Sequence, residues 1–320
     1  MSIEQSAPTD RLNYTGDLAP VITEICQTYN VGKPRDFSVI GMGYEDCNVI
    51  IDTDQDRFMA KMFAKTRTPE DISRYAAVMD QVIQAGVNHP EVLHAADGKT
   101  VLDTNGISLV LMRFIEGKTF YELGRLPNDA ERRAIIEQAA KINRIDFKPS
   151  YLFDSWAIPH IQAMYDKVRQ FIDPQDVPLA EEALKRYQAI PVNDLPQAFV
   201  HGDIIKTNVV LGDDGKPYII DFSVANWYPR VQELAVMAAN LLHEESGASL
   251  ADRCKLLTDE YTQFSDLTPE ERKYLYSYAL AGVAMEFMGS LQEKFLNGND
   301  NEETDYWLRL GRDGLQEALA

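Results

Sequence analysis

Residues 201–221 place the strongest limits on how this chain can fold. Two short apolar runs, 208–211 and 218–220, stand on either side of an Asp-Asp-Gly turn. This pattern predicts two antiparallel strands joined by a tight turn. A hairpin of this kind brings together the residues at its open end, which are Asn208 and Asp221.

Three oxygen-bearing side chains in this stretch suit phosphoryl transfer, in which a protein mainly positions groups and neutralises charge with metal ions. Asp203, at the start of a tight loop, can accept the proton of an attacking hydroxyl group. Asn208 offers Mg²⁺ a neutral oxygen and Asp221 a charged one, and phosphate oxygens and water complete such a shell. The alternative is that the two aspartates only cap turns. The order of all three residue types along strand, loop and hairpin favours the chemical interpretation.

The same residues carry a resemblance to a known family. His201-Gly202-Asp203 with Asn208, then Ile220-Asp221-Phe222, then Gln232-Glu233-Leu234-Ala235 are similar to motifs of the phosphotransferase family of aminoglycoside kinases. Choline kinases, methylthioribose kinases and type II homoserine kinases share this pattern. The resemblance implies that Asp203 is the catalytic base and that Asn208 and Asp221 bind metal ions.

The resemblance spans most of the chain and implies the bilobal, α+β fold of protein kinases. We therefore expect residues 1–115 to form a small N-lobe, a nucleotide-binding antiparallel sheet with one main helix. Residues 116–320 should form a larger, mainly helical C-lobe with the catalytic loop and the substrate pocket. Two positions depart from the family pattern, which usually has Asp where Glu233 stands and His where Asn143 stands.

A glycine-rich stretch lies about 160 residues before the expected catalytic loop. The apolar run 37–40 leads into Gly41 and Gly43, and a further run follows Asn48. Strand, glycine turn and strand is how a kinase lays backbone amides over ATP phosphates, because glycine lets the backbone approach closely. An ordinary hairpin turn is the alternative. Asn48 fills a position where the family commonly has Asn.

Lys61 stands alone inside the apolar run 57–63, which is unusual unless a partner pairs with it. In the family, a lysine or arginine on the third strand grips the α- and β-phosphates, and a glutamate on the next helix pairs with it. Tyr75 occupies the expected glutamate position. Asp71, one turn earlier, is therefore the expected partner of Lys61, with a solvated acid of the first helical turn as the alternative.

Residues 101–103 and 108–115 complete a five-stranded sheet, which Glu116-Gly117 ends as the family's interlobe hinge does. The resemblance implies that backbone groups of Arg113, Phe114 and Ile115 bind adenine. Residues 1–16 are expected to be a loose leader. Caps and apolar spacing predict helices over 17–30, 68–85, 128–146, 159–171, 178–190, 231–243, 248–264, 268–296 and 301–317.

Composition excludes several classes of function. The net charge is −19, from 31 basic and 50 acidic residues, which argues against nucleic acid as a partner. The three cysteines are far apart, so neither a disulfide framework nor a zinc site is expected. No run approaches the ~18 apolar residues of a membrane span, and the polar start is no signal peptide. We expect a cytoplasmic monomer or homodimer.

The sequence therefore predicts an ATP- and Mg²⁺-dependent kinase that transfers the γ-phosphate to a hydroxyl group of a small molecule. An amino-alcohol or amino-acid-like acceptor, similar to homoserine or choline, ranks first. An aminoglycoside phosphotransferase and a nucleotide-binding pseudokinase are the alternatives. Trp227 and Tyr228 could hold an ammonium group by cation–π contact or pack against the lobe. His201 is expected to be structural, and Lys206 to lie on the surface.

Overall fold

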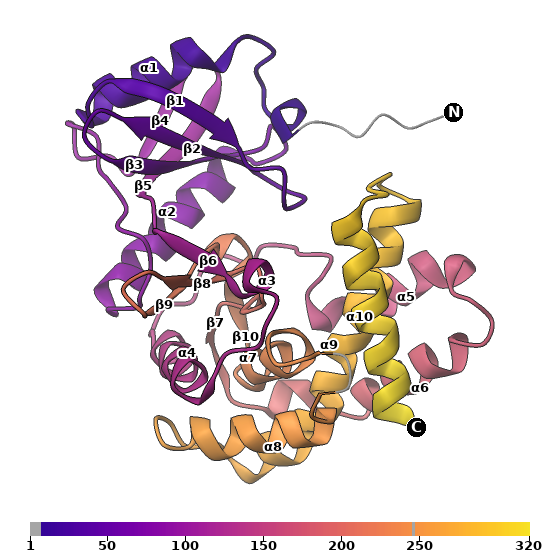
Figure 1. The fold of residues 1–320 in the computed structure, drawn as a ribbon. Helices are drawn as coiled ribbons and strands as arrows, with labels where there is room; N and C mark the ends of the chain where they lie inside the picture. The colour runs from indigo at the N-terminus through magenta and orange to yellow at the C-terminus, as the bar shows by residue number, and fades with distance from the viewer. Residues whose placement is uncertain (1–7, 245–246) are drawn as a thin grey trace. The chain divides into compact units, whose positions relative to one another are not determined.

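The computed structural model describes residues 8–244 and 247–320, which form two compact units (Figure 1). The sheet unit holds the chain up to Asp80 together with His89–Glu116. The helical unit holds Gln81–Asn88 and Gly117–Ala320. The fold is α+β, as the sequence predicts, with an antiparallel sheet in one unit and mainly helices in the other.

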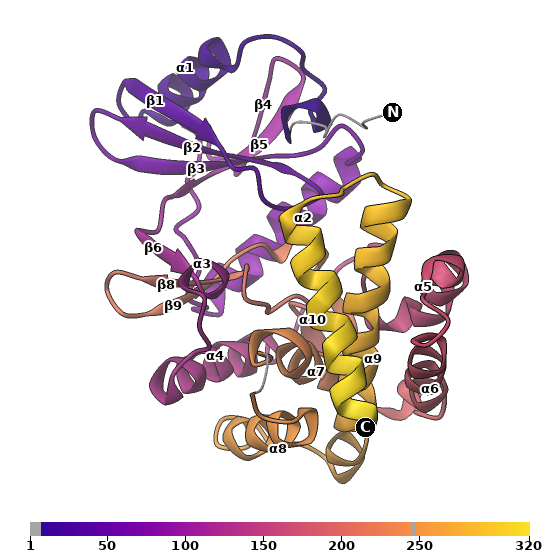
Figure 2. The ribbon, with the colours of Figure 1, turned by 45° about the vertical axis from the view of Figure 1, so that its right-hand side comes forward.

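The sheet unit is built on five antiparallel strands in the order β1-β2-β3-β5-β4. The strands are β1 (Pro34–Val39), β2 (Cys47–Thr53), β3 (Arg57–Met62), β4 (Val101–Thr104) and β5 (Ile107–Arg113). Buried and less buried residues alternate along β2, as expected for a strand with one face in the core. Helix α1 (Leu18–Tyr29) packs its apolar stripe on that face (Figure 2), and α2 (Pro69–Gln84) follows β3.

The segment before α1 differs from expectation. Residues 8–11 form a short 3₁₀ helix, and Leu12 packs into the core of the sheet unit with 3% of its surface exposed. The Lys65 N–H donates to the carbonyl of Arg11 at 2.8 Å. The prediction of a loose leader is therefore wrong for residues 8–16, because an apolar side chain and backbone bonds fix this segment. Residues 1–7 lie outside the described residues.

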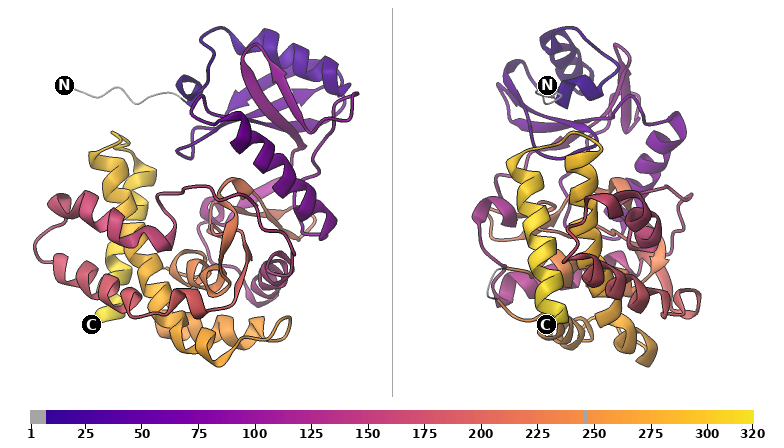
Figure 3. Two further views of the ribbon diagram at one scale, coloured as in Figure 1. Left: turned by 180° about the vertical axis from the view of Figure 1, so that it is seen from behind. Right: turned by 90° about the vertical axis from the view of Figure 1, so that its right-hand side faces the viewer.

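The helical unit is organised around α9 (Pro269–Phe295), which packs against helices from most of the unit. Because α9 is apolar on most of its circumference, other helices surround it (Figures 2 and 3). These helices are α5 (Ile161–Val168), α6 (Val177–Gln188), α7 (Val231–Val236), α8 (Leu250–Tyr261) and α10 (Glu302–Leu319). Two more, α3 (Phe120–Leu123) and α4 (Asp129–Ile142), precede them in the chain. A π-helical segment, Met237–Leu241, continues α7.

Two small sheets flank the segment that contains Asp203, Asn208 and Asp221 in the helical unit. One contains β6 (Gly117–Thr119), β8 (Val209–Gly212) and β9 (Pro217–Ile219) in the order β6-β8-β9. The other pairs β7 (Gln197–Val200) with β10 (Asn226–Pro229). The predicted hairpin is β8–β9, and its turn contains Gly215 at φ 79°, a conformation that glycine adopts without strain.

All three cysteines are buried and free. Among the described residues, no helix is long and apolar enough to cross a membrane.

Candidate active site

The loop between β7 and β8 is held from inside by His201. The backbone N–H of Asp203 donates to Nδ1 of His201 at 3.1 Å, and Nε2 lies 3.0 Å from the carbonyl of Ile220. Because a backbone N–H can only donate, Nδ1 is the acceptor and Nε2 carries the proton. Burial lowers the pKa of His201 to about 4, so the ring is neutral near pH 7. His201 is a structural residue, as expected.

Glu233 of α7 holds the same loop from the other side. Its carboxylate is fully buried and accepts hydrogen bonds from the backbone N–H groups of His201 at 2.7 Å and Gly202 at 3.2 Å. The side-chain amide of Asn143 donates to it at 3.1 Å, and Tyr261 donates to Asn143 at 2.9 Å. Burial raises the pKa of Glu233 to about 7. Glu233 and Asn143, the two residues that depart from the family pattern, are therefore hydrogen-bonded to each other.

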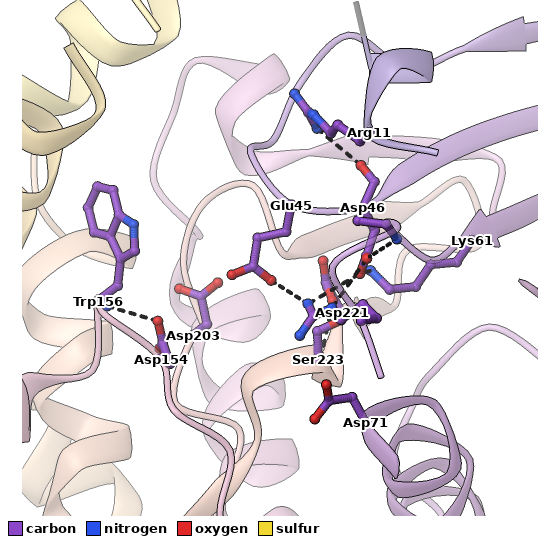
Figure 4. Close-up of polar contacts among 12 residues, drawn as sticks. Arg11, Glu45, Asp46, Lys61, Asp71, Asp154, Trp156, Asp203, Asp221 and Ser223 are labelled. Atoms are coloured by element: carbon purple, nitrogen blue, oxygen red, sulfur yellow. Dashed lines mark hydrogen bonds and ion pairs between the residues drawn. The ribbon is translucent and has the colours of Figure 1, made fainter. Parts of the chain in front are cut away.

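Asp203, Asn208 and Asp221 are brought together by the loop and the hairpin (Figure 4 shows Asp203 and Asp221). The Nδ2 group of Asn208 donates to Oδ2 of Asp203 at 2.7 Å and to its carbonyl at 3.1 Å. The Ile220 N–H donates to the carbonyl of Asn208 at 3.0 Å, which extends the hairpin to its open end next to Asp221. Asp221 adopts a left-handed backbone conformation at φ 64° and accepts from the N–H of Ser223 at 3.3 Å.

The donor atoms at the open end of the hairpin fit Mg²⁺. Because Nδ2 of Asn208 is directed to Asp203, its Oδ1 is left as a neutral ligand, and Asp221 adds a carboxylate. Within residues 8–244 and 247–320, no three His, Cys, Asp or Glu side chains cluster as a metal site. Two oxygen ligands suit an ion whose remaining ligands are phosphate oxygens and water.

Lys61 of β3 is 3% exposed, and its Nζ lies 3.1 Å from Oδ2 of Asp46. Asp71 does not provide the expected pairing. Its carboxylate accepts from the N–H and the hydroxyl of Thr68, both at 2.9 Å, at the start of α2. The prediction of Asp71 as the partner of Lys61 is wrong, because Asp71 caps its own helix. Asp46 was missed by sequence analysis.

The glycine-rich segment between β1 and β2 is joined at its base by a backbone hydrogen bond, and there is space around the Cβ positions of its two glycines. The Ile40 N–H donates to the carbonyl of Asn48 at 2.9 Å, and Asn48 stands opposite Lys61 in the β2–β3 register. A Cβ atom added to Gly41 or Gly43 meets no atom of the described part of the sheet unit within 4 Å. Gly43 has φ 91°, which strongly favours glycine.

Two backbone N–H groups at the end of β5 already form hydrogen bonds within the sheet unit. The N–H of Arg113 donates to the carbonyl of Glu91 at 2.9 Å, and the N–H of Phe114 donates to that of Arg57 at 3.1 Å. The Arg113 side chain forms ion pairs with Glu91 and Asp56. These two N–H groups are therefore already hydrogen-bonded within the sheet unit, and the binding of adenine by backbone groups of Arg113, Phe114 and Ile115 stays a prediction.

Trp227 and Tyr228 lie on β10 opposite Phe199 and Ala198. Because β7 runs towards Asp203 and β10 is antiparallel to it, each step along β10 leads away from the catalytic loop. Both residues are partly buried.

Lys206 differs from expectation. It is 5% exposed rather than on the surface, and its Nζ donates to the carbonyl of His243 and, at 3.1 Å, to the hydroxyl of Tyr306. Its backbone N–H donates to the side chain of Asn240, in the π-helical segment, at 3.1 Å. Lys206 therefore fastens the catalytic loop to the π-helical segment and to α10.

The fold and these sites define a kinase-like phosphotransferase, and comparison with known proteins agrees. Residues 36–264 match the model of the phosphotransferase enzyme family. The homoserine kinase of Zymomonas mobilis is 25% identical over 266 residues, which cover 80% of this chain and 80% of the relative.

Solved structures share the fold. Spectinomycin phosphotransferase APH(9)-Ia, in complex with ADP and spectinomycin, superposes with a TM-score of 0.68 at 14% identity, covering 96% of this chain and 99% of that one. A choline/ethanolamine kinase family protein from Mesorhizobium loti gives 0.62 at 17% identity, covering 88% and 87%.

The chain belongs to the phosphotransferase enzyme family, because the family model matches more than half of it. It is a small-molecule phosphotransferase whose acceptor is an alcohol group.

Proposed function

We propose that the protein transfers the γ-phosphate of ATP, with Mg²⁺, to the hydroxyl group of homoserine or a closely similar amino-acid-like or amino-alcohol acceptor. The observation that carries the kinase chemistry is the junction of Asp203, Asn208 and Asp221 at the open end of the β8–β9 hairpin. The choice of homoserine rests on relatives named homoserine kinase that span 80% of this chain.

In the proposed reaction, Asp203 accepts the hydroxyl proton of the acceptor and orients its oxygen. Asn208 donates to the Asp203 carboxylate, which fixes the direction of that carboxylate. Mg²⁺, held by Asn208 and Asp221, would neutralise charge on the phosphates. In the sheet unit, Lys61 and the backbone at Gly41 and Gly43 would bind those phosphates, supported by Asn48, and Ile115 would meet adenine.

Asp154 and Trp156 are proposed to contact the acceptor (Figure 4). Asn226 donates to the carbonyl of Leu152 at 2.8 Å and stands opposite Val200 in β10–β7. This ties the segment that contains Asp154 to the strand that leads into Asp203. A carboxylate and an aromatic face are groups that recognise an ammonium ion, which homoserine carries.

The test is an ADP-release assay with a panel of homoserine, choline, ethanolamine and aminoglycosides, with products identified by phosphorus NMR. We expect homoserine to have the highest kcat/KM. A higher kcat/KM for an aminoglycoside would refute the acceptor assignment, and nucleotide binding without transfer to any acceptor would favour the pseudokinase alternative.

Asp203→Asn is the mechanistic variant in the same assay. Removing a general base typically lowers the rate ~10²–10⁴-fold, so we expect a kcat loss of that order. Calorimetry should show unchanged nucleotide affinity. Near-normal turnover at saturating acceptor would remove Asp203 from the mechanism.

A further inference from the structure

Asp46 lies at the centre of a polar cluster in the sheet unit (Figure 4). Its side chain is 1% exposed. Oδ2 lies 3.1 Å from Nζ of Lys61, and Oδ1 accepts from the backbone N–H of Ala64 at 3.0 Å. Arg67 approaches both oxygens at 3.4 Å, and Arg11 donates to the Asp46 carbonyl at 3.1 Å. Four residues, from the stretch 61–67 and from Arg11, therefore contact this one acid.

The position of this acid is unusual for a kinase. Kinases pair the lysine of the third strand with a glutamate of the following helix, and this pair must form for activity. Here Tyr75 fills that helical position. It is 3% exposed, its ring lies 5.2 Å from that of Phe63, and its centroid is 5.9 Å from Nζ of Lys61. The helical position is packed as an aromatic site.

Asp46 precedes β2 directly, at the end of the glycine-rich segment. The β2–β3 register places Cys47 opposite Met62 and Asn48 opposite Lys61, so Asp46 lies within reach of the lysine ammonium. A carboxylate beside a buried ammonium offsets the cost of burying that charge.

We infer that Asp46 is a positioning residue that replaces the helical glutamate and holds Lys61 in place for the nucleotide phosphates. The inference rests on the proposed function of Lys61. Because Asp46 is also the last residue of the glycine-rich segment, its ion pair fixes the position of Lys61 relative to the base of that segment. Arg67, which pairs with Glu45 at 2.5 Å as well as with Asp46, reinforces the same end of the segment.

A double-mutant cycle tests this inference. ATP affinity is measured by calorimetry without acceptor for the wild type, Asp46→Asn, Lys61→Ala and the double variant. We expect each single variant to weaken ATP binding about tenfold, and Asp46→Asn to have little further effect once Lys61 is gone, because contacting residues are strongly coupled. The double variant also avoids an unpaired buried charge, so it stays folded if Asp46→Asn alone does not.

The possible failures are distinguishable. If Lys61→Ala leaves ATP affinity unchanged, the proposed role of Lys61 is wrong. If Lys61→Ala weakens binding and Asp46→Asn adds its full effect in that background, Asp46 acts by another route and the inference is overturned. The exposed acid Glu70 supplies the control, and Glu70→Gln should leave ATP affinity unchanged.

A relocation experiment gives a second, kinetic measurement. In Asp46→Asn, the KM for ATP should rise while the KM for the acceptor stays constant. Adding Tyr75→Glu places a carboxylate at the helical position. The KM for ATP should then fall most of the way back to the wild-type value. A folded double variant, checked by circular dichroism, that shows no recovery would contradict the idea that the acid has moved from helix to loop.

Discussion

Glu233 is a buried acid that accepts three hydrogen bonds, two of them from the consecutive backbone N–H groups of His201 and Gly202. Burial raises its pKa from 4.5 to about 7, whereas burial lowers that of His201 from 6.5 to about 4. The folded protein therefore binds a proton at Glu233 more tightly than the unfolded chain does, and at His201 less tightly. The two residues change stability in opposite directions between about pH 4.5 and 6.5.

Glu233→Gln isolates the contribution of Glu233, because His201 is present in both proteins. The stability linked to the Glu233 proton is full below pH 4.5 and is lost as pH rises through about 7. We expect the free energy of unfolding of the wild type, relative to the variant, to fall by about 2–3 kcal/mol between pH 5 and pH 8. Urea denaturation at the two pH values measures this, and a difference independent of pH would contradict it.

The residues that sequence analysis found and those it missed differ in how contacts are made. Asp203, Asn208 and Asp221 could be predicted together, because a tight loop and a two-strand hairpin fix their geometry locally. The contact of Glu233 with Asn143 joins positions 90 residues apart, and that of Lys206 with Tyr306 joins positions 100 apart. The residues next to a position in the sequence do not indicate which distant residues it contacts. The sequence therefore predicts Lys206 on the surface, because its partner Tyr306 lies far along the chain.

Helix α10 lies close to the backbone of α9 at Gly311. A Cβ atom added there would lie 2.4 Å from the backbone nitrogen of Phe287, so glycine permits the approach. Ala is favoured over Gly within a helix by about 1 kcal/mol, but overpacking against backbone costs about 1–3 kcal/mol. The steric term acts on backbone that cannot rotate away and should therefore exceed the helical preference.

We expect Gly311→Ala to lower the free energy of unfolding and the Tm of the protein. Asp313→Ala, an exposed substitution two residues along the same helix, is the matched control and should change both very little. Thermal and urea denaturation provide the measurement. A more stable Gly311→Ala protein would mean that the two helices separate at no cost.

Elements with their own start signals were predictable from sequence. Asp17, Asn128 and Thr268 cap α1, α4 and α9, as their spacing to the following residues indicates. The π-helical segment Met237–Leu241 and the β7–β10 pairing were not predicted. Both depend on tertiary contacts, and neither has a periodic signature of its own.

At the scale of the whole molecule, the chain passes between the two units three times. It enters the helical unit at Gln81, returns to the sheet unit at His89 and leaves it again after Glu116. Asn88 explains why this short excursion belongs with the helical unit. Its N–H donates to Oε1 of Gln138 at 2.9 Å, its carbonyl accepts from the N–H of Ile219 at 2.8 Å, and its side-chain amide donates to the carbonyl of Pro217 at 3.3 Å.

A fragment of residues 117–320 should therefore be less stable than one in which residues 81–88 precede it through a flexible linker. Without Asn88, the N–H of Ile219 loses an acceptor next to Asp221, and a lost buried hydrogen bond typically costs about 1–3 kcal/mol. Urea denaturation of both fragments, followed by circular dichroism, measures the difference. Equal midpoints would show that the excursion adds nothing to the helical unit.

The excursion at 81–88 also decides how this protein can be recombined with its relatives. A chimera made with one crossover at residue 116 would give the helical unit of one parent the Asn88 segment of the other. Crossovers at 80, 88 and 116 keep each unit's contacts within one parent. Each unit is built from two stretches of the chain, so the gene does not encode the two units as consecutive modules.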